Sequence, residues 1–299
     1  MFQFGFGEIM GLTTALLWSI SCTLHASVNR VVGPVGLIVV RFPVSIFMVG
    51  GAVYLTGVST SLPGYSLLWL LASGILAFTV CEYYFYSAIA RIGLRLTLII
   101  EALYACITAV LGWVFLGENM GWLGSLGIVI ASLGVAWVIM DTSPGTSLSP
   151  ANPKENIKGI VCAFLAALAL GTGLFLVKFA YQDNVDPLFS AFIRILSLAP
   201  LYPMLVFSGV GRTSIKAVVT HPKLILFLLL GGVFGNLLGV YCLQLSFLYT
   251  DAGVAAILVA MQPIFIIPIV AAMERRLPSL RMVLGTLISF AGVALVCLR

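Results

Sequence analysis

The sequence predicts an all-α polytopic membrane protein with ten transmembrane helices, built as two inverted five-helix repeats around a central cavity. Three observations predict this fold class. Of the 299 residues, 61% are hydrophobic and only 8% are charged, whereas soluble domains carry roughly 25% charged residues. Apolar segments of bilayer length, about 20 residues each, make up nearly all of the chain. The second half of the chain also repeats features of the first.

Short polar or Gly/Pro-rich breaks divide the chain into ten apolar segments. The first segment opens with Glu8 and lacks the basic flank and small-residue cleavage site of a signal peptide. We therefore expect it to be a retained helix. The ten predicted helices span residues 8–28, 35–55, 67–90, 94–116, 121–140, 157–180, 187–207, 223–249, 252–272 and 279–298.

The longest break, at residues 141–156, is rich in Ser, Pro and charged residues. It is too polar for hydrocarbon and has the composition of a linker. The sequence therefore predicts a first five-helix repeat at residues 1–140, a polar linker at 141–156 and a second repeat at 157–299.

The two halves align without a gap from the third helix of each half to the fifth. Under a shift of 158 residues, the matched positions include Gly74 with Gly232, Tyr83 with Tyr241, Gly127 with Gly285, and Gly134 with Gly292. Over the second helix the shift is 153 residues, which pairs Arg41 with Arg194. An ungapped run of this kind indicates an internal repeat, as many transporter folds contain.

The odd number of spans in each repeat requires its two copies to cross the membrane in opposite directions. The loop charges favour the same arrangement. Basic residues follow the first and third helices in the first half and the seventh and ninth helices in the second, and these loops lie on one side of the membrane only if the second repeat is inverted. The basic residues are Arg30, Arg91 and Arg95 in the first half, Lys154 and Lys158 in the linker, and Arg212, Lys216, Lys223, Arg275, Arg276 and Arg281 in the second half. The positive-inside rule then predicts a multi-pass inner-membrane protein with both termini on the non-cytoplasmic side.

Several short motifs carry a resemblance to a known family. They are Ala15-Leu16-Leu17-Trp18-Ser19, Arg41-Phe42, Leu116-Gly117-Glu118, Gly124, Gly127, Gly134-Val135, Gln262-Pro263, Glu274, Gly285 and Gly292-Val293. On these motifs the chain resembles the EamA-type ten-helix exporters of the drug/metabolite transporter (DMT) superfamily over essentially its whole length. It departs from the family pattern at Tyr104-Ala105 and at Ala166. The resemblance implies a transporter, and the tyrosines of the third and fourth helices suggest similarity to aromatic amino-acid exporters.

Polar residues that stay polar in both repeats are the candidates for a cavity lining. Polar groups in hydrocarbon are costly, so they should face the bundle interior or a wet cavity. Transporter sites lie where the repeats meet. Three pairs satisfy this condition: Tyr83 with Tyr241, Tyr86 with Gln244, and Tyr104 with Gln262. The alternative is that these groups only hydrogen-bond the helices together.

Two glutamates within predicted helices are candidates for proton coupling. Glu82 and Glu101 have no acidic partner in the repeat, which pairs them with Val240 and Val259. A carboxyl group away from water and without a cation favours its neutral form. It could therefore exchange protons and couple export to proton entry. The alternative is a structural ion pair or hydrogen bond with Arg41, Arg194, Lys178 or His25.

Four further residues have two interpretations each. Arg41 and Arg194 either bind an anionic group such as a carboxylate or serve the structure by snorkelling or pairing. His25 either lines the mouth of the cavity or forms a structural hydrogen bond. Trp18 either caps the cavity as an aromatic platform or packs between helices.

The function class expected from these features is secondary transport by alternating access, exporting small organic solutes. Amino acids, including aromatic ones, are the best-fitting substrates, because tyrosine rings can stack against them. A channel-like facilitator is the alternative. An intramembrane enzyme is disfavoured, since His25 and His221 are the only histidines.

The sequence accordingly predicts no catalytic residue, no metal site and no cofactor. It contains no G-x-x-x-x-G-K-[ST] loop, so we expect no direct ATP coupling by this chain. The expected partners are a small-molecule substrate, the lipid bilayer and protons. The net charge of +5 comes from loop residues and indicates membrane orientation rather than nucleic-acid binding.

Overall fold

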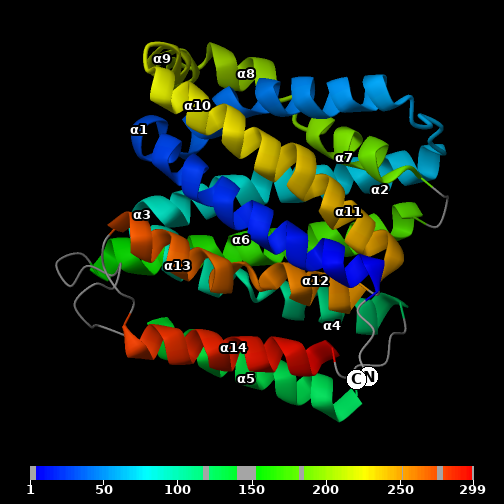
Figure 1. The fold of residues 1–299 in the computed structure, drawn as a ribbon, viewed down its shortest axis with the longest axis vertical. Helices are drawn as coiled ribbons and strands as arrows, with labels where there is room; N and C mark the ends of the chain where they lie inside the picture. The colour runs from blue at the N-terminus through cyan, green and yellow to red at the C-terminus, as the bar shows by residue number, and fades with distance from the viewer. Residues whose placement is uncertain are drawn as a thin grey trace.

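In the computed structural model, the part of the chain that is described consists of helices and short connections, without a strand (Figure 1). It comprises residues 5–116, 121–139, 153–181, 185–250, 252–274 and 279–297. Most of the predicted linker, residues 141–152, lies outside this part, as do Gly117, Glu118, Arg275 and Arg276.

Four continuous helical stretches are long and apolar enough to cross a bilayer. They are Phe6–Thr56, Gly64–Phe115, Pro153–Ala180 and Pro222–Tyr249. The first two contain 51 and 52 residues. A straight helix of that length would measure roughly 75 Å, more than twice the hydrocarbon thickness of about 30 Å. Each of these two stretches therefore holds two crossing segments, which is consistent with ten crossings in all.

Glycines make the two reversals inside these long stretches possible. Helix α1 (Phe6–Thr56) is interrupted at Gly33 (φ 73°, ψ 175°), and helix α3 (Glu82–Glu101) at Gly93 (φ 76°, ψ 165°). Only glycine adopts this region without a steric penalty. Pro34 follows Gly33 and restarts the helix, as proline does at a first helical position. The predicted breaks between residues 28 and 35 and between 90 and 94 are thus confirmed.

The remaining helices follow the predicted segments in order. In the first half they are α2 (Gly64–Gly74), the π-helical segment η1 (Ile75–Cys81), α4 (Tyr104–Leu116) and α5 (Gly121–Ile139). In the second half they are α6 (Pro153–Ala180), α7 (Pro187–Leu196), α8 (Tyr202–Phe207), α9 (Gly209–Val219), α10 (Pro222–Gly231), the π-helical segment η3 (Gly232–Gly239), α11 (Val240–Tyr249), α12 (Ala252–Ala260), α13 (Gln262–Glu274) and α14 (Leu280–Cys297).

The predicted helix at residues 187–207 is divided into two helices. Helix α7 ends at Leu196, a series of turns follows, and α8 begins at Tyr202. Pro200 and Pro203 explain the division, because neither residue can donate the backbone hydrogen bond that a continuous helix needs. The short helix α9, between α8 and α10, was not predicted from the sequence.

The irregular segments occur at places that the repeat relates to each other. A shift of 158 residues carries Ile75–Cys81 onto 233–239, so η1 superimposes on η3. The same shift relates the break between α3 and α4, at residues 102–103, to the break between α12 and α13 at residue 261. The two halves thus share the positions of their π-helical segments and helix breaks as well as of their helices. This agreement supports the internal repeat far better than single glycine matches do.

Helices α5 and α14, which the repeat makes equivalent, pack against each other in opposite directions (Figure 1). Gly134 of α5 lies against Ser289 and Gly285 of α14, whereas Gly292 of α14 lies against residues 131 and 127 of α5. Each contact in this set is the image of another under the 158-residue shift. Such a self-complementary contact is characteristic of a two-fold axis. The two repeats are therefore inverted relative to each other.

The helix ends that carry the loop arginines and lysines gather at one end of the bundle. The kinks of α1 and α3, the start of α6, and α9 lie together at the left in Figure 1, opposite the start of α1 and the end of α14. Arg91 Nε lies 3.2 Å from Glu155 Oε2, and Lys158 Nζ lies 2.7 Å from Glu155 Oε1. The basic residues of the described loops thus share one side, as the sequence predicts.

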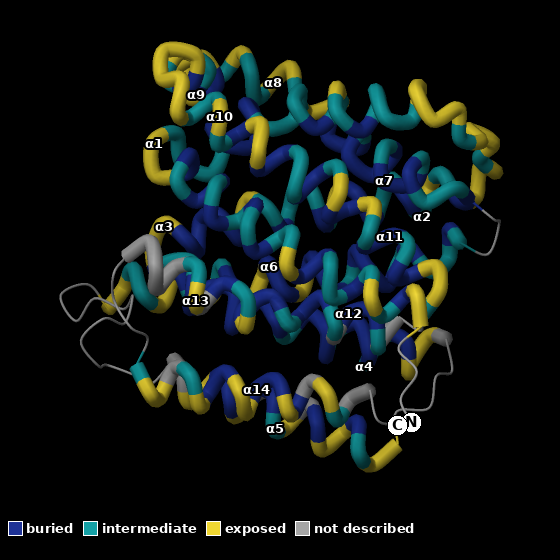
Figure 2. The backbone as a smooth tube through the Cα atoms, in the orientation of Figure 1, coloured by how far each residue is buried: buried dark blue, intermediate teal, exposed yellow. Residues whose placement is uncertain are grey.

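The distribution of polarity is that of a protein in lipid. Large apolar side chains such as Phe47, Tyr54 and Trp122 are exposed on the outside, while Arg194 and Gln244 are fully buried. Figure 2 shows the buried residues concentrated where the helices face each other. In hydrocarbon, polar groups must find partners inside the protein. The interior is therefore where a site for a polar ligand belongs.

Candidate functional site

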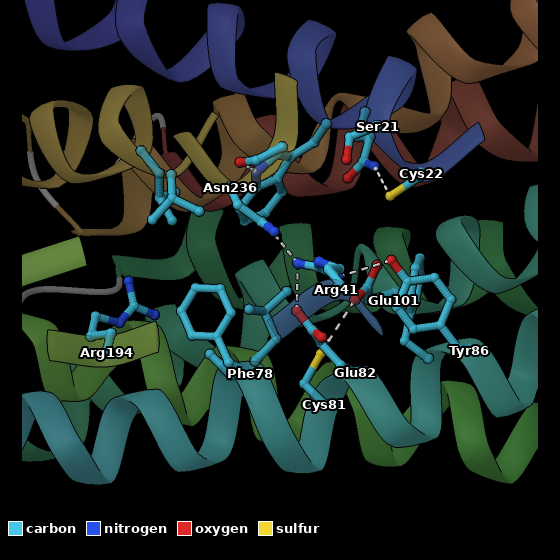
Figure 3. Close-up of a pocket in the computed structure, with 18 residues that line it drawn as sticks. Ser21, Cys22, Arg41, Phe78, Cys81, Glu82, Tyr86, Glu101, Arg194 and Asn236 are labelled. Carbon is cyan, nitrogen blue, oxygen red and sulfur yellow. Dashed lines mark hydrogen bonds and ion pairs between the residues drawn. The ribbon is translucent and has the colours of Figure 1, made fainter. Parts of the chain in front are cut away.

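A pocket lined by residues of both repeats holds about 630 Å³ of space, part of which is open to the outside (Figure 3). The first repeat contributes α1, η1 and α3, and the second contributes α6, α7, η3, α11 and α13. Both π-helical segments line it.

Arg41 is the centre of a polar cluster on one side of the pocket. Its Nη2 forms an ion pair with Glu82 Oε1 at 2.7 Å and donates to Asn236 Oδ1 at 2.6 Å. Its Nη1 donates to the Tyr86 hydroxyl at 3.1 Å. The Asn236 amide in turn donates to Ser45 Oγ. Arg41 therefore joins the second and third helices of the first repeat to η3 of the second.

Arg194 lies on the other side of the pocket in a different environment. Only 1% of it is exposed. Its Nη1 donates to Gln244 Oε1 at 3.0 Å, and Gln244 Nε2 donates to Ser190 Oγ at 2.6 Å. The Phe78 ring faces the guanidinium carbon at 5.3 Å from the ring centre, within cation–π range. Within the described part of the chain, no carboxylate is at ion-pair distance from Arg194.

The surroundings of the two arginines are images of each other under the repeat. Arg41 contacts Tyr86 in its own repeat, and Arg194 contacts Gln244, the residue equivalent to Tyr86. Arg41 reaches across to Asn236, and Arg194 reaches across to Phe78, the residue equivalent to Asn236. Among the charged residues around the two arginines, the symmetry fails at one point.

That point is Glu82, whose equivalent in the second repeat is Val240. Glu82 neutralises Arg41, whereas Val240, which is buried and also lines the pocket, leaves Arg194 without a carboxylate. The pocket therefore has a neutralised arginine on one side and a cationic arginine on the other.

Glu101 contributes a second carboxyl group to the pocket wall. It is 7% exposed, and its Oε1 accepts a weak hydrogen bond from the Cys81 thiol at 3.6 Å. Gln262, from the second repeat, donates from Nε2 to the Cys22 sulfur at 3.2 Å. No arginine, lysine or histidine of the described residues forms an ion pair with Glu101. Of the two glutamates, Glu101 is the one without a counter-charge.

Aromatic side chains complete the lining. Trp18, Phe78 and Phe85 face the pocket. The Trp18 indole donates from Nε1 to the Gly235 carbonyl within η3 at 3.2 Å. This hydrogen bond holds the Trp18 ring against η3, where the backbone hydrogen bonds follow the π-helical pattern instead of the α-helical one.

Seven of the twelve predicted site residues line the pocket. They are Trp18, Arg41, Glu82, Tyr86, Glu101, Arg194 and Gln262. The other five do not, namely His25, Tyr83, Tyr104, Tyr241 and Gln244. Gln244 stands behind Arg194 as its hydrogen-bond partner.

The prediction that Tyr83 and Tyr241 face the cavity is wrong. They are 43% and 37% exposed on the outside of the bundle. Glu82 and Phe85 of α3 line the pocket. At 100° per residue, Tyr83 lies about 100° from Glu82 and about 160° from Phe85. The match between the tyrosines reflects equivalent positions on the surface rather than a shared lining.

Tyr104 and His25 have structural partners instead of a place in the lining. The Tyr104 hydroxyl donates to the Ala256 carbonyl at 3.0 Å and joins α4 to α12. His25 Nδ1 lies 3.2 Å from Ser21 Oγ, and its ring packs against Gly231. Both residues therefore hold helices together, which was the alternative interpretation for each.

Asn236 and Phe78, which contact the two arginines, are among the lining residues that the sequence argument missed. They occupy equivalent positions, but one is polar and the other apolar, so a filter for positions that stay polar excludes both. The available signal was Asn236 itself, an amide within a glycine-rich apolar segment.

The comparisons with known proteins agree with this architecture. The model of the EamA-like transporter family matches the chain twice, over residues 5–140 and 157–298. A solved crystal structure superimposes with a TM-score of 0.70 at 16% identity, over 98% of this chain and 96% of that one. At this identity the likeness concerns the fold alone. No curated protein matches, so the narrower resemblance to aromatic amino-acid exporters gains no support.

Proposed function

Because the chain belongs to the EamA-like transporter family, we propose that it exports small organic solutes across the inner membrane, with amino acids, including aromatic ones, as its substrates. The observation that carries this proposal is the pocket between two inverted repeats, lined by charged side chains of both repeats and by aromatic rings of the first. Transporter sites of inverted-repeat folds are found at this interface.

The lining suits a solute with a charged group and an apolar body. Arg194 offers a positive charge and Glu101 a carboxyl group, neither with an ion-pair partner among the described residues. Trp18, Phe78 and Phe85 offer ring faces. Aromatic rings stack with each other and with apolar groups. An amino acid has both kinds of group.

Alternating access follows from two repeats that can exchange conformations. The π-helical segments η1 and η3 line the pocket at equivalent positions, and such segments often mark functional sites. In our proposal they are the weak points at which the third and eighth spans bend. The division at residues 1–140, 141–156 and 157–299 separates the two moving units.

The proposed orientation places the end of the bundle that carries the basic loops in the cytoplasm, following the positive-inside rule. Both termini then lie on the non-cytoplasmic side. In this orientation the end of the bundle with Arg91 and Lys158 is cytoplasmic. Export then means that the solute enters the pocket from this end and leaves at the opposite end.

Reconstitution tests the proposal. Purified protein in proteoliposomes is supplied with a labelled panel of amino acids, with and without a pH gradient. We expect saturable uptake that speeds up when unlabelled substrate is present on the far side, since exchange is characteristic of a carrier. Uptake without saturation or exchange would favour a channel, and no uptake of any panel member would contradict the proposed substrates.

We expect Glu101→Gln to abolish the dependence of transport on a pH gradient. Glutamine keeps the size of the side chain and cannot release a proton. Coupling free energies of 1–3 kcal/mol correspond to about fivefold or more in affinity. We therefore expect a pH gradient to change the affinity of the wild type for its substrate by at least about fivefold, and not to change that of the variant. Transport rates are compared at equal and opposed pH, with Glu155→Gln at the exposed end as the control. A gradient effect that survives in Glu101→Gln would exclude this carboxyl group as the proton carrier.

We expect Tyr83→Ala and Tyr241→Ala to leave transport within about twofold of wild type, because substitutions at exposed positions usually change free energies by less than about 0.5 kcal/mol. Trp18→Ala, which removes a ring from the pocket, should lower transport well beyond that range. Rates are normalised to the amount of protein in the vesicles. A strong defect in either tyrosine variant would show that the outer surface takes part in transport.

A further inference from the structure

We propose that Arg194 is the binding site for the carboxylate of the transported solute, and that Arg41 is not. The inference rests on the proposed function and names the chemical group that this pocket selects: a carboxylate attached to an apolar or aromatic body. It starts from a difference in charge between the two repeats: Glu82 pairs with Arg41, whereas the position equivalent to Glu82 near Arg194 is Val240.

Arg41 has no charge to offer a ligand, because Glu82 pairs with it at 2.7 Å. Its two terminal nitrogens also donate to Tyr86 and Asn236. A second carboxylate at Arg41 would lie beside Glu82, and like charges at that distance repel. Arg41 is therefore a structural residue that joins the repeats.

Arg194 has a charge without a counter-charge. It is 1% exposed, its Nη1 donates to a neutral amide, and its Nε has no hydrogen-bond partner in the described part of the chain. A buried cation in this condition is costly, and a carboxylate that pairs with it recovers part of that cost. Arg194 belongs to the pocket wall, so the pocket is the side from which a carboxylate would approach it.

The position of Arg194 is fixed before any ligand arrives. Gly74, at the junction of α2 and η1, lies so close to the backbone of α7 that a Cβ atom there would be 2.8 Å from the Arg194 Cα. The Gln244–Ser190 chain holds the guanidinium from behind. A group positioned in this way binds with a smaller loss of entropy on association.

Phe78 determines what the carboxylate must be attached to. Its ring covers the guanidinium at 5.3 Å and stands between Arg194 and the Arg41–Glu82 pair in Figure 3. A ligand that reaches Arg194 from the pocket must therefore pass along this ring. Apolar or aromatic substituents gain contact there, whereas strongly polar ones lose hydration without replacement.

The probes are 3-phenylpropionate and 3-phenylpropionamide, which have the same shape and differ in charge. Dissociation constants are obtained from the ligand-dependent rise in Tm of the purified protein in detergent. Charged hydrogen bonds in buried sites contribute about 1.5–3 kcal/mol, so we expect the acid to bind at least about tenfold more tightly than the amide. Equal affinities, or no binding of the acid, would overturn the proposal.

Val240→Glu is the decisive variant, because it places the counterpart of Glu82 beside Arg194 without changing Arg194 itself. We expect it to lower the affinity for the acid to that of the amide. Val240→Gln, of equal size and neutral, should retain the preference for the acid. Arg194→Gln should lose the preference, and Arg194→Lys should keep part of it. If Val240→Glu retains the full preference, the carboxylate binds elsewhere.

The two proposals fail separately. A protein that transports amino acids but binds the acid and the amide equally would overturn the Arg194 subsite and leave the transport function intact. A protein that selects the acid through Arg194 but moves no solute in proteoliposomes would overturn the transport function and leave the subsite intact.

Discussion

Replacing Glu82 by glutamine is expected to lower the free energy of unfolding by about 3 kcal/mol, because breaking a buried pair leaves an uncompensated charge. The side chains of Glu82 and Arg41 are only 14% and 12% exposed, and their ion pair measures 2.7 Å. Arg41 Nη2 would keep Asn236 as an acceptor, but its charge would face apolar walls. Unfolding is followed in mixed micelles of a mild detergent and a denaturing one.

A double-mutant cycle separates the ion pair from the rest of the cluster. The single variants are Glu82→Gln and Arg41→Gln, and the double variant carries both. If each single change leaves a charge unpaired, the double variant should be more stable than the sum of the two losses predicts. Glu155→Gln, at the exposed pair with Lys158, is the control and should change the stability little. Additive losses within the cycle would contradict a direct ion pair.

The fold could be predicted from the sequence because lipid imposes a simple condition on composition. Within the described residues, each predicted segment is helical apart from short turns, and the breaks at Gly33 and Gly93 are where polar or Gly/Pro signals occur. The exceptions have local causes. Pro200 and Pro203 divide the predicted seventh helix, and a short helix forms in the loop at 209–219.

The candidate site was predicted in part, for reasons that concern geometry. Equivalent positions in two repeats share their depth and their direction, and the paired residues Arg41 and Arg194 both line the pocket. The same pairing failed for Tyr83 and Tyr241, because equivalence applies to the outer surface as well as to the interior. Only the direction of the side chain distinguishes the two cases, and one sequence does not determine which side of a helix faces inward.

The π-helical segments could not be predicted at all. Each widens the helix by about one residue per turn, which changes the direction of every side chain that follows relative to those that precede it. Phe78 and Cys81 within η1, and Asn236 within η3, reach the pocket from these segments. A helical wheel at 100° per residue does not describe them.

Replacing Gly134 or Gly292 by alanine is expected to lower the free energy of unfolding by about 2 kcal/mol each, within the range for overpacked positions. A Cβ atom at Gly134 would lie 2.7 Å from the Ser289 Cα, and one at Gly292 would lie 2.8 Å from the Ala131 Cα. These atoms belong to backbone, so they cannot turn aside as a flexible side chain would. The helices α5 and α14 would have to separate.

The two-fold contact between α5 and α14 also predicts how the losses of stability at Gly134 and Gly292 compare with each other. The two substitutions should have similar effects, because each glycine meets the image of the surface that the other meets. The double variant should lose less than the sum, since helices already separated by one alanine have room for the other. Gly51→Ala, at a helical glycine with no atom within 4 Å of the added Cβ, is the control and should be neutral or slightly stabilising. Unequal losses, or full additivity, would mean that α5 and α14 do not meet through a shared axis.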